Sequence, residues 1–230
     1  MSALWNVLVA PDAAFDELRE RPAWVFALLA CMVVTTITQF LSLPALQHAF
    51  IASFPAQLAH DPNAASMTPD QRKHAMDFAL GILRVGPFIS GIVAPVVAVL
   101  VTAIVLLAAA AIGRGTVSFA RLFALAANVA IVWFVLAQIV ITAIVLARGA
   151  TSYEATWELY LAMPSLAWIA PGAPPKVLAF LSGVNPFSIW SLVLLGRGTA
   201  RIARIAPWPA YAAATAVTLC SCLFVTLAVR

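Results

Sequence analysis

The chain has 230 residues, a formal net charge of +4, and a composition in which 63% of residues are hydrophobic and only 10% are charged. With a mean hydropathy of +1.00, it has too few polar side chains to cover a soluble globule, which excludes an ordinary water-soluble domain. The sequence therefore predicts an integral membrane protein.

A polar leader precedes the first apolar stretch. It mixes apolar side chains with Asp12, Asp16 and Arg19, and Pro11 interrupts it. This pattern predicts a short amphipathic segment in the headgroup layer of the membrane. The leader is long and acidic, unlike the short basic start of a signal peptide, so we expect it to remain attached to the first span.

Five apolar stretches follow the leader. A spanning helix needs about 20 mostly apolar residues, and each stretch meets that length without an acidic residue. The predicted spans cover approximately residues 23–43, 86–112, 122–147, 177–195 and 208–229. They predict an all-α, polytopic fold: a five-helix transmembrane bundle with short interfacial helices. We expect a cytoplasmic leader, residues 1–22, and a single membrane domain, residues 23–230.

The second apolar stretch is longer than a bilayer requires and contains Gly86, Pro87, Gly91 and Pro95. Pro95 removes an internal hydrogen bond and its ring presses on the preceding turn, so a kink is expected there. Broken helices line substrate sites in many transporters. Kinked helices also occur in membrane proteins that transport nothing, so the sequence leaves both interpretations open.

The polar groups inside the predicted spans are neutral, and Gln39, Asn128 and Gln138 stand out among them. Such side chains either form hydrogen bonds between helices or line a polar path through the membrane. Ionisable residues at bilayer depth are typical of proton-coupled transport. The spans contain none away from their ends, which disfavours that mechanism.

Both predicted outer connections contain signals of local structure. In the connection that covers residues 44–84, Thr68 and Pro69 read as the N-cap and first residue of a helix that runs into the second span. Tyr and Trp residues crowd the connection that covers residues 149–176, as is usual at the headgroup interface. We expect a short interfacial helix from near Ser152 to Met163, ahead of Pro164.

Two short connections, residues 113–121 and 196–207, hold arginines and no acid. Short basic loops face the cytoplasm, which predicts a cytoplasmic N-terminus and an outer C-terminus. Arginines near the membrane surface also attract anionic lipid headgroups. The candidates for headgroup binding are Arg114, Arg121, Arg197, Arg201 and Arg204.

The two basic connections resemble each other in sequence. GRGT at 113–116 is followed by Ala120 and Arg121, and GRGT at 196–199 is followed by Ala203 and Arg204. This echo fits a parallel repeat of two helical hairpins. Short cytoplasmic loops also favour glycine and arginine in general, so chance remains an alternative.

Two motifs resemble the bacterial Yip1-domain family, and with the five spans the similarity covers nearly the whole chain. One is the leader sequence APDAAFDELRERPAWVFALL, and the other is VNPFSIWSLVLLGRGTARIARI at 184–205. The resemblance implies a five-helix membrane domain with a cytoplasmic N-terminus. The acidic cytoplasmic motifs of the trafficking members of that family are missing. The residues that carry the resemblance are Pro11, Phe15, Arg21, Pro22, Asn185, Pro186, Phe187, Trp190 and Gly196.

No catalytic, nucleotide-binding or metal-binding motif occurs in the sequence. We therefore predict a protein that is not an enzyme and has no cofactor, in the cytoplasmic (inner) membrane of a bacterium. Its expected partners are anionic lipids and other membrane proteins or a further copy of itself, with no nucleic acid. The alternative is a facilitator or transporter of a small or amphipathic molecule, built around the kinked second span.

Overall fold

The computed structural model describes residues 2–59 and 67–228, and within these ranges it is all helical. Two short helices form the leader, namely α1 (Ser2–Val9) and α2 (Pro11–Glu20). The helices of the bundle are α3 (Val25–Ala59), α4 (Pro69–Ile112), α5 (Phe119–Ile131), the π-helix η2 (Val132–Ala137), α6 (Gln138–Arg148), α7 (Pro175–Ser182), α8 (Pro186–Ala203) and α9 (Pro207–Ala228). Three short 3₁₀ helices lie between α6 and α7: η3 (Ala150–Ser152), η4 (Thr156–Ala162) and η5 (Leu166–Ile169).

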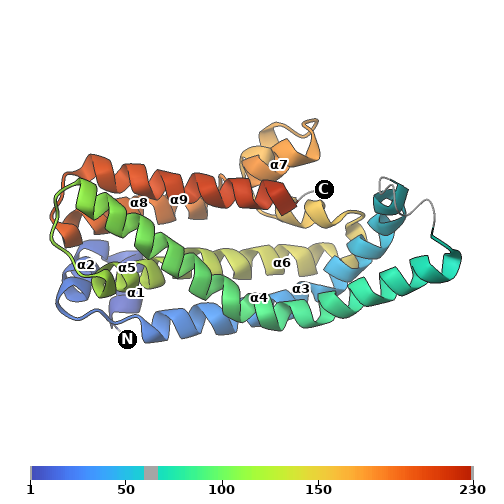
Figure 1. Ribbon diagram of the computed structural model, residues 1–230, viewed down its shortest axis with the longest axis horizontal. Helices are drawn as coiled ribbons and strands as arrows, with labels where there is room; N and C mark the ends of the chain where they lie inside the picture. The colour runs from blue at the N-terminus through green and yellow to red at the C-terminus, as the bar shows by residue number, and fades with distance from the viewer. Residues whose placement is uncertain (1, 60–66, 229–230) are drawn as a thin grey trace.

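The bundle contains enough long apolar helices for a protein that crosses the membrane several times. Within the described residues, four helices are long and apolar enough to span it, or five if the bent pair of α7 and α8 counts as one span. The helices run lengthwise and alternate in direction (Figure 1). We call the end that carries α1 and α2 the leader end, and the end that carries α7 the far end. The prediction of a polytopic helical membrane protein is confirmed.

The first two spans are longer than predicted, because most of the expected connection at 44–84 is helical. α3 has 35 residues and continues through Pro44 and Pro55, and α4 has 44 residues. Thr68 caps α4 as predicted: its side chain accepts a hydrogen bond from the backbone N–H of Gln71, and the Gln71 side chain accepts one from the Thr68 backbone. The prolines are accommodated because neighbouring groups in a packed membrane helix re-satisfy the backbone that a proline frees.

The predicted third span, residues 122–147, is one pass made of α5, η2 and α6. The π-helix widens the turn in the middle of this pass and releases carbonyl groups from the usual bonding pattern. One of them, the Phe134 carbonyl, accepts a hydrogen bond of 3.1 Å from the Thr35 hydroxyl of α3. The irregular segment is therefore satisfied by a neighbouring helix, as hydrocarbon surroundings require.

The predicted fourth span, 177–195, is wrong as a single helix. The chain bends by 48° between α7 and α8. Asn185 ends the break, because its side chain accepts hydrogen bonds of 3.0 Å from the backbone N–H groups of Phe187 and Ser188. Pro186 then occupies the first helical position, where the missing N–H costs nothing. The Asn-Pro-Phe motif is thus the start signal of α8.

The predicted connection at 196–207 is also wrong, because α8 continues to Ala203. Two glycines let this helix pack at close range. A methyl group on Gly196 would lie 2.5 Å from the Tyr211 ring, and one on Gly198 would lie 2.6 Å from Leu125 and 3.0 Å from Phe15. Gly-Arg-Gly reads as a turn in a sequence, but here the missing side chains serve helix packing.

The GRGT echo does not mark a structural repeat. Residues 113–116 form the turn that follows α4, whereas residues 196–199 lie inside α8. Arg121 is in the first turn of α5, whereas Arg204 ends α8 in the left-handed conformation. The matching residues of the two segments therefore have different backbone conformations, and the similarity in sequence does not support two related hairpins.

The leader and the membrane helices share one hydrophobic core at the leader end. Ala14, Phe15 and Leu18 of α2 are fully buried in a cluster with residues of α4, α5, α8 and α9. Side chains such as Leu122 and Ile202 complete it. The division of the chain at residue 22 stays a prediction, and the structure adds that the apolar face of α2 is covered by protein.

Gly198 should be a sensitive position for stability. We expect Gly198→Ala to lower the stability of the fold by about 1–3 kcal/mol, because the added methyl group overpacks the contact of α8 with Phe15 and Leu125. Thermal unfolding of the purified protein in detergent measures this. Gly172→Ala is the matched control, since no atom lies within 4 Å of the methyl group it would add. Equal unfolding temperatures for the two variants would contradict the close packing described here.

Candidate functional site

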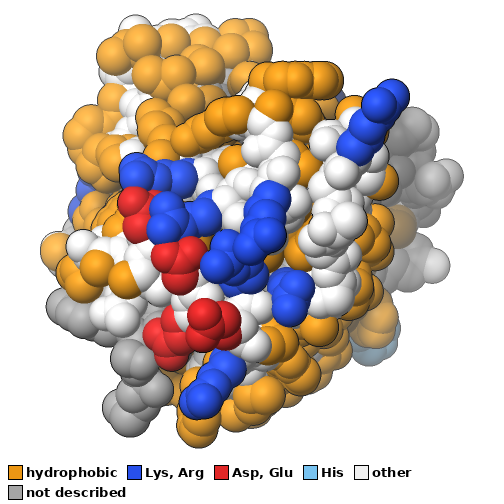
Figure 2. Space-filling view, turned by 90° about the vertical axis from the view of Figure 1, so that its left-hand side faces the viewer, with side chains coloured by type: hydrophobic (Ala, Val, Ile, Leu, Met, Phe, Trp, Pro, Cys, Tyr) orange, Lys and Arg blue, Asp and Glu red, His pale blue; other side chains and the backbone are white. Residues whose placement is uncertain are grey.

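The leader end carries half of the charged residues of the chain. Seven arginines and four acids lie in the leader, in the turns after α4 and α8, and in the nearby ends of α5 and α8. Basic side chains gather across this face, and the acidic side chains gather toward one side of it (Figure 2). The residues are Asp12, Asp16, Glu17, Arg19, Glu20, Arg21, Arg114, Arg121, Arg197, Arg201 and Arg204.

Two of these arginines form ion pairs with the leader. Arg197 donates from Nη2 to Oδ2 of Asp12 at 2.6 Å. Arg201 donates to both carboxylate oxygens of Asp16, from Nε at 3.0 Å and from Nη2 at 2.6 Å. Asp12 and Asp16 are one turn apart on α2, and the two arginines are one turn apart on α8, so the spacings match.

Burial and charge have different roles at this contact. The side chains of the ion pairs are 41–55% exposed, and water screens such pairs so that they add little free energy. Phe15 and Leu18 are fully buried beneath them, and each apolar side chain of that size contributes about 1.5–3 kcal/mol relative to exposure. Burial holds α2 in place, and the ion pairs fix its register along α8.

The ion pair also changes how Asp16 responds to pH. The hydrogen bond from Arg201 is the main reason that the pKa of Asp16 falls below its usual value of 3.8. Because the pKa of the acid is lowered in the folded state, the pair contributes fully above 3.8, and its contribution is lost as pH falls through the lowered pKa.

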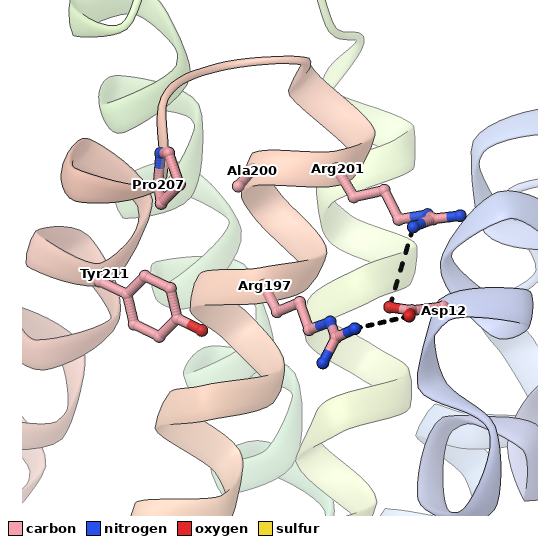
Figure 3. A pocket seen from close by; sticks show the side chains of 6 residues that line it. All are labelled: Asp12, Arg197, Ala200, Arg201, Pro207 and Tyr211. Carbon is pink, nitrogen blue, oxygen red and sulfur yellow. Dashed lines mark hydrogen bonds and ion pairs between the residues drawn. The ribbon is translucent and has the colours of Figure 1, made fainter.

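An open hollow of about 420 Å³ lies beside the ion pairs, between α8 and α9 (Figure 3). Its wall on the α8 side is charged, and its wall on the α9 side is formed by Pro207 and Tyr211. The Oδ1 atom of Asp12 is buried without a hydrogen-bond partner and lies 3.9 Å from Arg201. The residues around the hollow are Asp12, Arg197, Ala200, Arg201, Pro207 and Tyr211.

The other three candidate arginines, Arg114, Arg121 and Arg204, make no side-chain ion pair with any described residue. Arg114 and Arg204 have φ values of 57° and 54°, and they are the non-glycine residues with positive φ in the described part of the chain. Their turns are adjacent, because a methyl group on Gly115 would lie 2.6 Å from the Ala203 carbonyl oxygen. A helix that ends in this left-handed conformation usually has glycine or asparagine there, so arginine at the ends of both α4 and α8 is unusual.

The intramembrane polar candidates lie in different parts of the bundle. Gln39 accepts a hydrogen bond of 2.5 Å from Ser90, which joins α3 to α4. Asn128 is 2% exposed and donates at 2.8 Å to the Ala23 carbonyl, in the elbow between leader and α3. Gln138 is partly exposed and has no side-chain hydrogen bond to a described residue. The structure does not bring the three together into one polar site.

The four residues predicted to kink the second span and line a cavity lie on two sides of α4. Pro87, Gly91 and Pro95 are buried one turn apart, and a methyl group on Gly91 would clash with Thr36 of α3. Gly91 therefore serves the close approach of α3 and α4. Gly86 has open space around it. α4 changes direction about halfway along its length (Figure 1).

The remaining motif residues mainly shape the backbone and the helix contacts. Pro11 is the first residue of α2, Arg21 and Pro22 form the elbow before α3, and Trp190 is partly exposed on α8. The sequence reasoning missed Asp12, Asp16 and Tyr211 as parts of this site. The matched spacing of four between the two acids and between Arg197 and Arg201 was the available signal, but 185 residues separate the partners.

No group of three or more metal-binding side chains that could hold an ion occurs among the described residues. A family model described as the Yip1 domain matches residues 5–229. A search of curated proteins and a search of solved structures each gave no match.

Exchanging the charges of one ion pair tests how the leader docks. Arg201→Asp alone places a second carboxylate beside Asp16, so we expect the leader to detach from α8 more readily. The detachment would be measured as a faster rate of proteolytic cleavage at residues 19–21. The double variant Asp16→Arg with Arg201→Asp restores opposite charges and should return cleavage toward the original rate. Asp70→Arg is the control, because it reverses an acid of α4 outside this contact. A double variant that is cleaved as fast as the single one would contradict the assigned pairing.

Proposed function

The chain belongs to the Yip1 domain family, and on that premise we propose that it is a non-enzymatic membrane protein that holds anionic lipid headgroups at its leader end. In this role it would organise lipids around itself and around partner membrane proteins. The observation that supports the proposal most is the group of three arginines, Arg114, Arg121 and Arg204, that have no ion-pair partner among the described residues.

The backbone at two of these arginines favours a binding role. A non-glycine residue in the left-handed region costs of order 1–3 kcal/mol and persists only where its surroundings fix it. Arg114 and Arg204 both adopt it, in neighbouring turns. This strain directs two charges to one small area of the surface, which suits a phosphate-bearing headgroup.

Exposed apolar side chains next to the arginines support a position of this area at a membrane interface. Ile112 and Trp208 are both 69% exposed, and Phe119 is also exposed. Tryptophan prefers the headgroup level, where an apolar ring and a polar edge are both accommodated. Arginines at the same level would meet lipid phosphates directly.

Arg197 and Arg201 have a different part in this proposal. Neither basic connection contains an acid, but Asp12 and Asp16 of the leader form ion pairs with these two arginines. We assign this pair of arginines to leader docking and the other three to headgroups.

We further propose that the leader end faces the cytoplasm of a bacterium, with the N-terminus inside and the C-terminus outside. The support is the density of arginine in the two turns and helix ends on this side, 113–121 and 196–204, neither of which contains an acid. The positive-inside rule weighs such short basic segments most.

Lipid retention tests the headgroup assignment. Replacing Arg114, Arg121 and Arg204 by Gln should weaken binding of anionic phospholipid by about 3 kcal/mol in total, roughly a hundredfold, at about 1 kcal/mol per arginine. Native mass spectrometry of the protein in lipid nanodiscs measures the bound lipid. Arg197→Gln with Arg201→Gln is the matched control and should retain most of it. Unchanged lipid in the triple variant would refute the proposal.

Thiol labelling in intact cells tests the orientation. In a background without the native cysteines, we expect an impermeant reagent to label Lys73→Cys at once and Thr116→Cys only after the membrane is permeabilised. Both positions are exposed in the structure. The opposite order would invert the orientation, and equal labelling of both would indicate mixed insertion.

A further inference from the structure

The open hollow beside the ion pairs has a polar edge on each side of α8. In Figure 3 the Tyr211 ring reaches from α9 toward α8. Arg197 and Arg201 reach from α8 toward the leader helix α2, where Asp12 lies. Between the two edges α8 presents Ala200, whose side chain is a single methyl group. The volume of about 420 Å³ is within the range of sites that hold a whole small ligand, roughly 300–1,000 Å³.

Close packing holds the Tyr211 ring at its edge of the hollow. A methyl group on Gly196 would lie 2.5 Å from this ring, so the ring lies directly against the backbone of α8. The Tyr211 hydroxyl has no hydrogen bond to a described residue. The phenol is therefore a positioned donor that no described part of the chain uses.

The two arginines keep unused donors after they pair with the leader. A guanidinium has five N–H groups. Arg197 uses only Nη2, in its bond to Asp12, and Arg201 uses Nε and Nη2, in its bonds to Asp16. Nη1 of Arg201 lies 3.9 Å from Asp12, which is too long for a hydrogen bond. The unused N–H groups suit phosphate oxygens, which guanidinium groups bind through charge-assisted hydrogen bonds.

Asp12 supplies an unused acceptor beside these donors. Its Oδ2 atom accepts one hydrogen bond, from Arg197, and its Oδ1 atom accepts none. Because Oδ1 is buried, a donor that reaches it must be small. A primary ammonium is small and carries three N–H groups, whereas a trimethylammonium group is bulky and has none.

The charges around the hollow cancel. Asp12 and Asp16 of the leader face two arginines of α8, so this group has no formal net charge. It therefore attracts a plain anion much less than Arg114, Arg121 and Arg204 do. It offers both signs of charge, and a ligand with a phosphate and an ammonium complements both.

We propose that the hollow binds a zwitterionic headgroup made of a phosphate and a primary ammonium, as in phosphatidylethanolamine. The phosphate accepts hydrogen bonds from Arg197 and Tyr211, and the ammonium donates to Asp12. These contacts use donors and acceptors that the ion pairs leave free, so the leader stays docked. The exposed indole of Trp208 follows directly after the wall residue Pro207, and tryptophan favours the level of lipid headgroups. The ligand has no net charge, so this site is separate from the one proposed for anionic headgroups.

Competition between two lipids tests the ammonium contact. We expect the purified full-length chain in detergent, given equal amounts of phosphatidylethanolamine and phosphatidylcholine with the same acyl chains, to retain the first roughly tenfold more. Native mass spectrometry measures both lipids. Asp12→Asn should abolish the preference. Asp16→Asn is the matched control, because it removes the other acid of the leader contact and does not line the hollow; it should keep the preference.

Two results of this competition would overturn the proposal. One is equal retention of the two lipids by the original chain. The other is equal loss of the preference in Asp12→Asn and Asp16→Asn, because that result would assign the effect to leader docking alone.

Tyr211→Phe tests the phosphate contact. Both lipids carry the phosphate, so this variant should hold each of them roughly two- to tenfold more weakly and leave their ratio unchanged. Tyr160→Phe is the matched control, because Tyr160 lies in η4, outside the hollow. Unchanged retention of both lipids by Tyr211→Phe would contradict the phosphate assignment.

Soluble phosphoethanolamine carries the same two groups and separates a free ligand from a lipid. Its displacement of bound phosphatidylethanolamine at equal concentration would assign the site to the soluble molecule, and retention of the lipid would assign it to the membrane. Either result supports the proposed headgroup chemistry. Free alanine has an ammonium and a carboxylate but no phosphate, so displacement by alanine as effective as by phosphoethanolamine would overturn it.

The two proposed lipid sites fail independently of each other. The variant with Arg114, Arg121 and Arg204 replaced by Gln should keep its preference for phosphatidylethanolamine, and Asp12→Asn should keep its anionic lipid. Loss of the preference in the triple arginine variant, with the preference intact in Asp12→Asn, would overturn the site in the hollow and leave the anionic headgroup site in place.

Discussion

Inside a bilayer no water is present to satisfy a backbone N–H or C=O group, and the architecture of this protein follows from that constraint. Helices satisfy most of these groups internally. Where the helices are irregular, a side chain supplies the missing partner: Thr35 bonds the carbonyl released by the π-helix, and Asn185 caps the helix that follows the break. Asn128 does the same for the elbow after the leader. The few polar side chains in the spans are thus largely structural.

The second organising feature is close packing through residues without side chains. Hydrocarbon gives no hydrophobic drive between helices, so association depends on close contact and small residues. Gly91, Gly196 and Gly198 each bring another helix or side chain to contact distance. Gly198 has the widest effect, because it lets α2, α5 and α8 meet at one point. That meeting point joins the leader to the bundle and places Asp12 and Asp16 beside the arginines of α8.

This arrangement divides five similar arginines into two groups. Two form ion pairs with the leader, and the other three, in turns and at helix ends, form no ion pair with a described residue. The leader therefore belongs to the charged site, although its apolar face is buried like a core element.

The sequence by itself determined the fold class, the presence of several membrane-spanning helices and the start of α4, because long apolar runs and local capping signals act over short distances. Thr68 and Pro69 are of this kind. It did not determine where α3 and α8 end, since Pro44 and the Gly-Arg-Gly segment read as breaks when their neighbours are unknown. Only the tertiary structure showed that Gly198 is a packing contact and that Asp12 and Asp16 pair with Arg197 and Arg201. Those partners are 185 residues apart, and only the folded bundle brings them within hydrogen-bond distance.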